Sequence, residues 1–370
     1  MYNWQNPAWP NFEYKLSLQT QEKLYLYAKE TSRLVGAMQQ IAENAEDALL
    51  EILVLEGQKT SEIEGEIINA ADIRSSLRQQ IGLPNDDMPH DERAKGIATL
   101  LMKCRYSFEA PLTEEMVHQW HQMVMMGSYF KPEQIGCFRN NPEPMQNVSE
   151  PIGRERIYFE APPSSRIVQE MRQFIEWFNQ TVKEPGPIRA AITHLYFESI
   201  HPYLDGNGRI GRALAEKALS QDLGFPVLYS LSNTLMEHRK QYYEMLHQNS
   251  QVSLEISTWI EFFVDQVYQA QLFAKQQVEF IIKKTQFWQK YAQTLNSRQS
   301  KVIKRMLAGG VNGFKGGMST KKYISITDCS KATATRDLTE LVAMGCFLKR
   351  TGLGRNTSYD LCFCIANDDL

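Results

Sequence analysis

The 370-residue sequence lacks an apolar run that approaches the roughly 20 residues needed to span a bilayer, so we expect no membrane segment. Its first residues lack a basic stretch followed by an apolar one, which predicts that there is no secretory signal. Cysteine is scarce, and the six cysteines are scattered, which fits a reducing compartment better than a disulfide framework. These absences together predict a cytoplasmic protein.

A strong net charge is also missing, because the whole chain carries only −3 at pH 7. Such a balance by itself predicts no polyanionic partner. The charge is uneven, however, because residues 296–370 hold twelve lysines and arginines against six acidic residues, a local balance of +6. At 370 residues the chain is too long for one small core and predicts two or three domains, the last of them basic.

The most informative stretch is 201–212, which joins a histidine, a carboxylate, a glycine-rich turn and two arginines. The turn at 206–208 has little side-chain bulk, so its backbone N–H groups can converge on an anion. The composition after it predicts a helix over 209–219, whose start would add unpaired N–H groups and a positive dipole end. Arg209 and Arg212 share one face of that helix and can reach the same ligand. The stretch therefore predicts a polyphosphate site.

Two further side chains in this stretch suit a reaction at a bound nucleotide. Asp205 offers the hard oxygen that Mg²⁺ prefers, and Mg²⁺ usually arrives with the nucleotide. His201 carries an imidazole, the usual general base near neutral pH. Taken singly, a Gly-Asn-Gly turn, a histidine and two helical arginines are usually structural. Their combination around one ligand is what indicates a site.

Residues 201–212 resemble the signature of the Fic family, His-Pro-Phe-x-Asp/Glu-Gly-Asn-Gly/Lys-Arg-x-x-Arg, with Tyr203 in place of phenylalanine as the sole departure. The tyrosine keeps the ring and adds a hydroxyl that needs a partner, so we expect it to change packing rather than chemistry. The resemblance implies that His201 is the catalytic base and that Asp205 holds Mg²⁺. It also implies that ATP is bound by Gly206, Asn207, Gly208, Arg209, Ile210, Gly211 and Arg212.

A second motif lies upstream of the first. Local signals predict a helix break at Gly57, followed by a short helix that Thr60 or the next residue caps and that Gly65 ends. The segment resembles the inhibitory signature of Fic proteins, Ser/Thr-x-x-x-Glu-Gly/Asn, which Thr60, Glu64 and Gly65 match. This resemblance implies that Glu64 pairs with Arg212, removes a contact of the γ-phosphate and inhibits the enzyme.

Most of the chain before residue 296 reads as helical. Residues 1–15 are an exception, because their aromatic residues and prolines predict an irregular arm docked on the body. His118 and His121 have the spacing of metal ligands, but without a third ligand nearby a solvated or core helix face is the better interpretation. The other expected helices cover 16–44 and 46–56, as two helices or one bent helix, and 67–110 with an interruption at 82–89. Further ones cover 112–124, 168–179, 187–200, 237–248 and, as one or two helices, 256–295.

Residues 146–160 contain the one β-hairpin predicted for the core, with strands at 146–151 and 156–160. The hairpin resembles the Fic flap, which in that family holds the target segment as an added strand. We therefore expect a protein target to dock there, with a simple surface hairpin as the alternative. In the family a tyrosine of the following helices lines the adenine site, and Tyr243 is the candidate here, although buried tyrosines usually belong to the core.

The C-terminal part, 296–370, resembles a winged helix, with three helices at 297–307, 320–326 and 330–344 before a basic hairpin at 347–361. Protein docking, dimerisation and DNA binding are all uses of such a domain, so a homodimer and a DNA partner stay open. The side chains that would reach DNA phosphates are Ser330, Lys331, Thr333, Thr335 and Arg336 on the third helix and Lys349, Arg350 and Arg355 on the hairpin.

We therefore expect a mainly α protein with an N-terminal helical region over 1–105, a Fic catalytic core over 106–290 and a winged-helix domain over 296–370. The resemblance implies an adenylyltransferase that moves AMP from ATP to a Ser, Thr or Tyr hydroxyl of a protein, itself included. Two alternatives stay open: removal of AMP from the same targets, and a DNA-binding regulator whose Fic domain senses the nucleotide. The target protein is not specified by these patterns.

Overall fold

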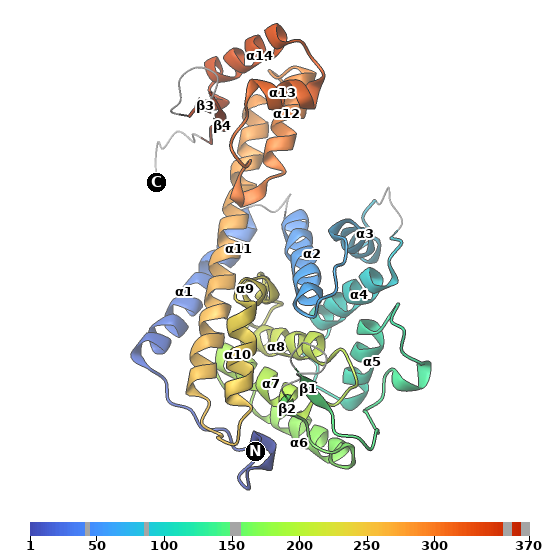
Figure 1. Ribbon diagram of the computed structural model, residues 1–370. Coiled ribbons are helices and arrows are strands. Elements are labelled where there is room, and N and C mark those ends of the chain that lie inside the picture. Colours follow the sequence, from blue (N-terminus) through green and yellow to red (C-terminus); the bar gives the residue numbers. More distant parts are fainter. Residues whose placement is uncertain (41–44, 85–88, 149–156, 351–356, 364–370) are drawn as a thin grey trace. The chain divides into compact units, whose positions relative to one another are not determined.

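The computed structural model describes residues 1–40, 45–84, 89–148, 157–350 and 357–363. The chain divides into two compact units, of which the first comprises 1–34 and 49–274 and the second 35–48 and 275–370 (Figure 1). Most of the predicted N-terminal region, 1–105, lies in the same unit as the predicted core, and the division into three domains stays a prediction. Among the described residues, no helix has the length and apolarity to cross a bilayer.

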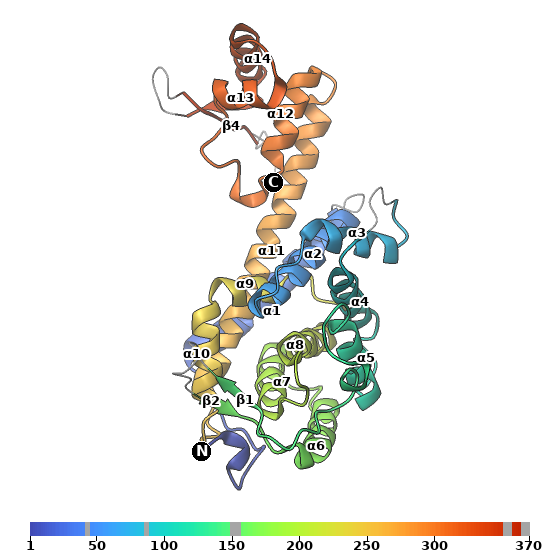
Figure 2. The same ribbon diagram turned by 45° about the vertical axis from the view of Figure 1, so that its right-hand side comes forward.

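The first unit consists of helices packed around a central pair, α7 and α8 (Figure 2). Both helices are buried along nearly their whole length, because apolar or small residues occupy most of their faces. The turn that joins α7 to α8 is therefore anchored at each end by a buried helix. Its elements are α1 (Leu18–Gln40) up to residue 34, α2 (Ala45–Ile63) from residue 49, α3 (Ala70–Gln80), α4 (Glu92–Tyr106), α5 (Glu114–Val124), β1 (Gln146–Val148), β2 (Ile157–Glu160), α6 (Ile167–Gln180), α7 (Gly186–Ile200), α8 (Asn207–Leu223), α9 (Leu231–Glu237), α10 (Arg239–Asn249) and α11 (Ser257–Tyr291) up to residue 274.

Helix α2 continues without interruption to Ile63, so the predicted break at Gly57 is wrong. A Cβ at Gly57 would approach Leu101 Cδ1 to 3.2 Å and Ile73 Cγ2 to 3.3 Å. Glycine therefore permits close helix packing here, which outweighs its lower helix propensity of about 1 kcal/mol. As a consequence, Thr60 lies in the last turns of α2 and is not a helix cap, which corrects that prediction as well.

The remaining helices of this unit lie close to their predicted bounds, with two exceptions. Helix α8 begins at Asn207, two residues earlier than predicted, and α9 was not predicted at all. Helix α9 is short and is stabilised by a cap, since Ser230 Oγ accepts a hydrogen bond from the Asn233 N–H at 3.2 Å. Helix α5 begins with a cap of the same kind, because Thr113 Oγ1 accepts from the Met116 N–H at 3.1 Å.

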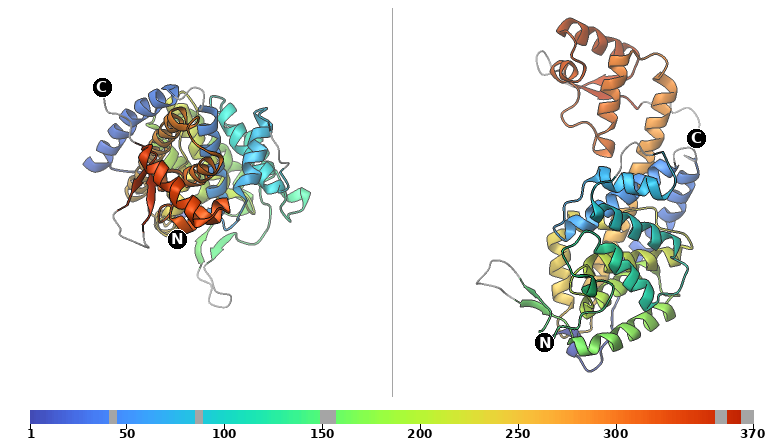
Figure 3. Two further views of the ribbon diagram at one scale, coloured as in Figure 1. Left: turned by 90° about the horizontal axis from the view of Figure 1, so that it is seen from above. Right: turned by 90° about the vertical axis from the view of Figure 1, so that its right-hand side faces the viewer.

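Strands β1 and β2 pair antiparallel, with Gln146 opposite Glu160, which confirms the predicted hairpin. Its connecting residues, 149–156, lie outside the described residues. The N-terminal arm is docked on the body, as expected: the Trp9 indole donates to Glu170 Oε2 at 2.8 Å. Figure 3 shows this arm beside the hairpin.

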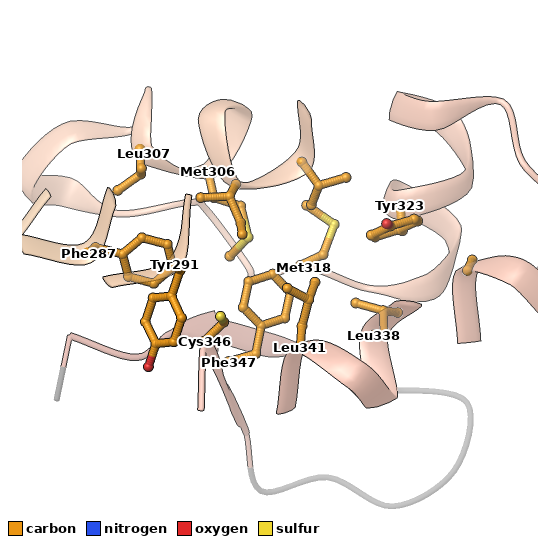
Figure 4. Close-up of a cluster of buried hydrophobic side chains, with 13 residues drawn as sticks. Phe287, Tyr291, Met306, Leu307, Met318, Tyr323, Leu338, Leu341, Cys346 and Phe347 are labelled. Carbon is orange, nitrogen blue, oxygen red and sulfur yellow. The ribbon is translucent and has the colours of Figure 1, made fainter. Parts of the chain in front are cut away.

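The second unit has its own core, formed where three helices and a hairpin meet the end of α11 (Figure 4). The order of its helices and strands is the one predicted from sequence. The assignment of this unit as a winged helix stays a prediction, and so do its contacts with DNA. One of the residues predicted to contact DNA, Arg355, lies outside the described residues. The elements are α12 (Ser297–Leu307), α13 (Thr320–Thr327), α14 (Lys331–Ala343), β3 (Phe347–Lys349) and β4 (Tyr359–Leu361).

A buried carboxylate, Asp337, joins three helices of this unit. It accepts hydrogen bonds from Arg298 Nε at 2.9 Å, from Arg298 Nη2 at 3.2 Å and from the Tyr323 hydroxyl at 2.9 Å. Burial alone would raise the pKa of Asp337, but these hydrogen bonds outweigh it and hold the pKa below its usual range. The charged group is thus compensated in a core that is otherwise apolar.

Candidate functional site

The turn between α7 and α8 has a backbone that its own residues hold in place. His201 ends α7 with a φ of +49°, and Gly206 precedes α8 with a φ of +82°. Asn207 closes the turn, because its Oδ1 accepts from the Tyr203 N–H at 3.0 Å and its Nδ2 donates to the Tyr203 carbonyl at 2.8 Å. The side chain of Asn207 therefore shapes the loop. His201 is the non-glycine residue of this turn at positive φ, a backbone conformation that is uncommon and points to a functional position.

Arg139 fixes the backbone around His201, and the sequence did not indicate it as a site residue. Its Nε donates to the His201 carbonyl at 2.8 Å, and its backbone N–H donates to the Pro202 carbonyl at 2.9 Å. Its Nη2 donates to the Pro162 carbonyl at 2.5 Å. Burial lowers the pKa of Arg139 to about 10, so the guanidinium remains charged at neutral pH. Three carbonyl contacts make this arginine a rigid support for the turn.

The imidazole of His201 lies next to a carboxylate that was also missed. Its Nδ1 is 3.6 Å from Glu198 Oε2, and the two side chains are 12% and 14% exposed. Burial alone would raise the pKa of Glu198, but the neighbouring imidazoles and Arg212 outweigh it and lower the pKa. An ionised carboxylate here can orient the ring and stabilise positive charge on it. The spacing of three residues at a helix end was the signal that could have identified Glu198.

The hydroxyl that distinguishes Tyr203 from the family's phenylalanine finds its partner in His118, whose Nδ1 lies 2.9 Å away. The Tyr203 ring stacks on His121, with ring centroids 3.9 Å apart. Both histidines therefore pack against the turn. This agrees with the prediction that they belong to a packed helix face. Within the described parts of the chain, no group of three or more potential ligands is arranged to hold a metal.

A cavity of about 730 Å³ opens at this turn, within the range of about 300–1,000 Å³ that is typical of ligand sites. Its lining includes His201, the stretch 204–208 and residues from four further places: the hairpin, α7, α10 and Glu64, which follows α2. Tyr243 lines it too, and its hydroxyl donates to the Ile63 carbonyl at 3.0 Å. The predicted adenine contact of Tyr243 stays a prediction, while its contact with the end of α2 is a finding.

Arg212, fully buried in α8, binds the end of α2 through three nitrogens. Its Nη1 donates to Glu64 Oε1 at 2.7 Å, while Nε and Nη2 donate to the hydroxyl and the carbonyl of Thr60, each at 2.8 Å. Burial alone would lower the pKa of Arg212, but the Glu64 carboxylate outweighs it and raises the pKa. The structure thus brings the two sequence motifs into direct contact, with the residues predicted for each.

Arg209 also carries a carboxylate partner, and this one was not predicted. Its Nη1 donates to Glu66 Oε2 at 2.9 Å, and its Nη2 lies 3.6 Å from Asp205 Oδ1. The Arg209 side chain is 4% exposed and that of Glu66 is 30% exposed. Both arginines expected to bind phosphate are therefore paired with acidic residues from one short segment.

Glu64 lies directly against the start of α8. A Cβ at Gly208 would come within 2.1 Å of Glu64 Oε1, so the carboxylate fills the space that a side chain would take. Helix starts attract anions, and this carboxylate occupies that position. Gly65, with a φ of +85°, lets the chain turn away after the carboxylate.

Two residues expected at the nucleotide have packing roles. Ile210 is fully buried in the core. Gly211 leaves room for the central helix pair, because a Cβ there would lie 2.8 Å from His194 Nδ1 and 3.1 Å from Glu198 Oε1. Both residues thus pack α8 on α7, and their contact with the nucleotide stays a prediction.

Behind the site, His194 makes stability depend on pH. Burial lowers its pKa to about 4, whereas the imidazole titrates near its usual value in the unfolded chain. Below pH 6.5 the imidazole is therefore protonated in the unfolded state but stays neutral in the folded state. The free energy of unfolding falls as the pH drops toward 4. Between pH 7 and pH 5 we expect His194 to account for a loss of about 2 kcal/mol.

The matched variant is His194→Gln, which does not titrate and can still bond the Tyr242 hydroxyl, now 2.7 Å from His194 Nε2. Urea unfolding of both proteins at pH 7 and pH 5 measures the difference. An equal loss of stability in the two proteins would show that this histidine is not responsible.

Comparison with known proteins matches two family models to the chain. The Fic/DOC family matches residues 111–219, and a domain of unknown function (DUF4172) matches residues 2–83. A Fido domain-containing protein of Dictyostelium discoideum is 35% identical over 99 residues, which is 24% of this chain and 68% of that protein. The protein adenylyltransferase fic-1 of Caenorhabditis elegans is 32% identical over 83 residues, 22% of this chain and 15% of that protein. The crystal structure of a Fic family protein from Desulfovibrio desulfuricans has a similar fold, with a TM-score of 0.51 and 16% identity over 96% of this chain and 99% of that one.

Fold and site together define a helical protein whose central helix start, at the mouth of a cavity, is chemically suited to an anion. The chain belongs to the Fic/DOC family. Its match spans only 15% of the length of the C. elegans adenylyltransferase.

Proposed function

We propose that this chain is a protein adenylyltransferase, which transfers AMP from ATP to a hydroxyl group of a protein. The observation that carries the proposal is that His201 and the start of α8 line one cavity, with two buried arginines on α8. The target oxygen attacks the α-phosphorus of ATP. The bond from that phosphorus to the oxygen bridging the α- and β-phosphates breaks, and pyrophosphate leaves. His201 takes the proton of the attacking hydroxyl. Family membership and the names of the relatives support this choice of reaction.

The residues around His201 prepare it for this role. Glu198 stabilises the positive charge that the ring acquires with the proton. Arg139 holds the His201 carbonyl, so the imidazole approaches the cavity from a fixed backbone. A target segment would lie along the β1–β2 hairpin as an added strand and present its hydroxyl to the ring.

The phosphates are bound by the start of α8. The backbone N–H groups of Asn207 and Gly208 would face the negative charge, while that of Gly206 donates to Asp205 Oδ1 at 2.6 Å. Arg209 and Arg212 would bind the outer phosphates. Asp205 is 47% exposed and offers one carboxylate, which fits Mg²⁺ because that ion commonly takes one carboxylate together with substrate phosphates. When bound there, the ion would neutralise charge on the phosphate oxygens.

We propose that Glu64 inhibits this reaction. Its ion pair occupies Arg212 and places a negative charge at the helix start where a phosphate belongs. ATP can then bind only with its outer phosphates displaced from the arrangement that transfer requires. The observed contact between Glu64 and Arg212 supports this account.

Glu66 is expected to add a smaller inhibitory effect through Arg209. Because this pair is partly exposed, it is worth up to about 1 kcal/mol, which corresponds to at most about a fivefold effect. In a Glu64→Gly background, Glu66→Gln should therefore lower the KM for ATP by up to about fivefold. The control is Glu62→Gln, which removes a surface pair with Lys59 at 2.7 Å on the same segment. Equal effects of the two changes would rule out a specific role for Glu66.

The proposed activity is tested by incubating wild-type and Glu64→Gly protein with labelled ATP and Mg²⁺, followed by intact-protein mass spectrometry. A mass increase of one AMP on this chain or on an added protein is the expected result. ATP hydrolysis without any protein-bound AMP would contradict the proposal.

The reverse reaction is a second candidate, because Glu64 lines the same cavity as His201 and is 28% exposed. There its carboxylate could orient a water toward the bond between AMP and a modified target. Release of AMP from an adenylylated protein by wild-type chain, with Mg²⁺ and without ATP, would establish it. Loss of that release in Glu64→Gly would identify the residue.

A further inference from the structure

The N-terminal arm contacts the cavity from behind, on three of its walls. Asn3 is fully buried, and its Nδ2 donates to Ser199 Oγ of α7 at 2.8 Å. The Asn3 backbone N–H donates to the Ser250 carbonyl at 3.0 Å. Both Ser199 and Ser250 line the cavity. One asparagine therefore joins the end of α7 to the end of α10.

The next residue, Trp4, binds the third wall, which is the base of the hairpin. Its indole N–H donates to the Glu160 carbonyl at 2.6 Å, and its ring packs in a small buried cluster with Phe159 and Ala161. Phe159 also lines the cavity. Asn3 and Trp4 act together, because Asn3 Oδ1 accepts from the Trp4 N–H at 2.8 Å.

The hairpin needs such support. Its described strands have only three and four residues, and a two-stranded hairpin of this size is marginal in water. Beyond the strand pairing, its base is closed by the Ala161 N–H, which donates to the Met145 carbonyl at 2.9 Å. Trp4 packs against this end of the hairpin.

From these contacts we infer that Asn3 and Trp4 are positioning residues, which hold the hairpin at a fixed place relative to His201. The inference rests on the proposed transfer reaction, in which the hairpin presents the target. A misplacement of about 1 Å between reacting groups can cost about a hundredfold in rate, so a loose hairpin would lower transfer. The arm lies within residues 2–83, which match the domain of unknown function. The inference therefore assigns a positioning role to the first residues of that domain.

The test compares Trp4→Ala with Phe12→Ala, both in a Glu64→Gly background. Phe12 is an aromatic residue of the same arm, but its ring packs on Trp9 and Tyr196, with centroids 5.3 and 5.7 Å away. In Trp4→Ala we expect hydrogen–deuterium exchange of residues 157–161 to accelerate at least about tenfold and transfer to a protein target to fall about tenfold. Phe12 reaches the Trp4 cluster only through Trp9, so in Phe12→Ala both changes should be clearly smaller than in Trp4→Ala.

Trp4→Phe keeps one ring in the cluster and removes the pyrrole ring with its donor to Glu160, so it serves if the alanine variant does not fold. An intermediate rise in exchange at 157–161 is expected for it. Unchanged exchange in both Trp4 variants, or equal changes in the Phe12 variant, would overturn the inference. If the parent transfers no AMP, the proposed activity fails, while exchange measured without nucleotide still decides whether the arm holds the hairpin.

Discussion

Replacing Glu64 with glycine should raise the rate of AMP transfer about tenfold to a hundredfold, which corresponds to about 1.4–2.8 kcal/mol. The physical reason is competition for one guanidinium. Arg212 is fully buried and donates to Glu64 at 2.7 Å, so a phosphate reaches it only if this ion pair breaks. Glycine removes the charge and also clears the space above Gly208. Initial rates with labelled ATP, including self-modification, measure the gain.

A matched control separates this effect from a general loosening of α2. Glu62→Gly introduces the same residue two positions earlier, in the last turn of α2, so it loosens the helix end and removes the surface pair with Lys59 but keeps Glu64. It should leave the transfer rate within about twofold of wild type, since surface pairs are worth little. Glu64→Gln keeps the volume and removes the charge, so an intermediate gain would assign part of the inhibition to sterics. A Glu64→Gly protein that is no faster than wild type would refute the inhibitory role.

The residues of the α7–α8 turn could be predicted because they are contiguous. Twelve successive positions hold the imidazole, the glycines and both arginines, so no knowledge of distant contacts was needed to group them. The second motif was recognisable for the same reason. Its local structure was nevertheless predicted wrongly, because Gly57 reads as a helix break by propensity alone. In the folded protein the approach of Leu101 and Ile73 explains that glycine, so tertiary packing decided the outcome.

Two residues that the sequence did not indicate, Glu66 and Arg139, reach the site from far along the chain, whereas the third, Glu198, lies three positions before His201. Glu66 lies 143 residues from Arg209, and Arg139 lies 62 residues from His201. Nothing in the local pattern of an acidic or basic residue says which distant group it will meet. Tyr203 illustrates the intermediate case: its hydroxyl predicted that a partner exists, but only the packing of α5 on the turn identified His118.

The second large effect is expected at His201. In the Glu64→Gly background, His201→Ala should lower AMP transfer by about 100-fold to 10,000-fold, the usual contribution of a general base. Binding of a non-hydrolysable ATP analogue should change less than about threefold, since the phosphate contacts assigned to α8 do not involve the imidazole. Rapid-quench measurements of transfer and calorimetric titration of the analogue give the two quantities on the same samples.

The backbone at His201 determines which control is needed. Its φ of +49° is strained for alanine but is tolerated better by asparagine, so His201→Asn removes the base at less cost to the fold. If the base is what matters, both variants lose transfer to the same extent and both still bind the analogue. If instead the asparagine variant retains more than about a tenth of the parent rate, well above the loss expected for a missing base, then the imidazole serves the shape of the turn. Because Arg139 and Asn207 hold that turn through backbone groups and Tyr203, we expect the shape to survive and the chemistry to be lost.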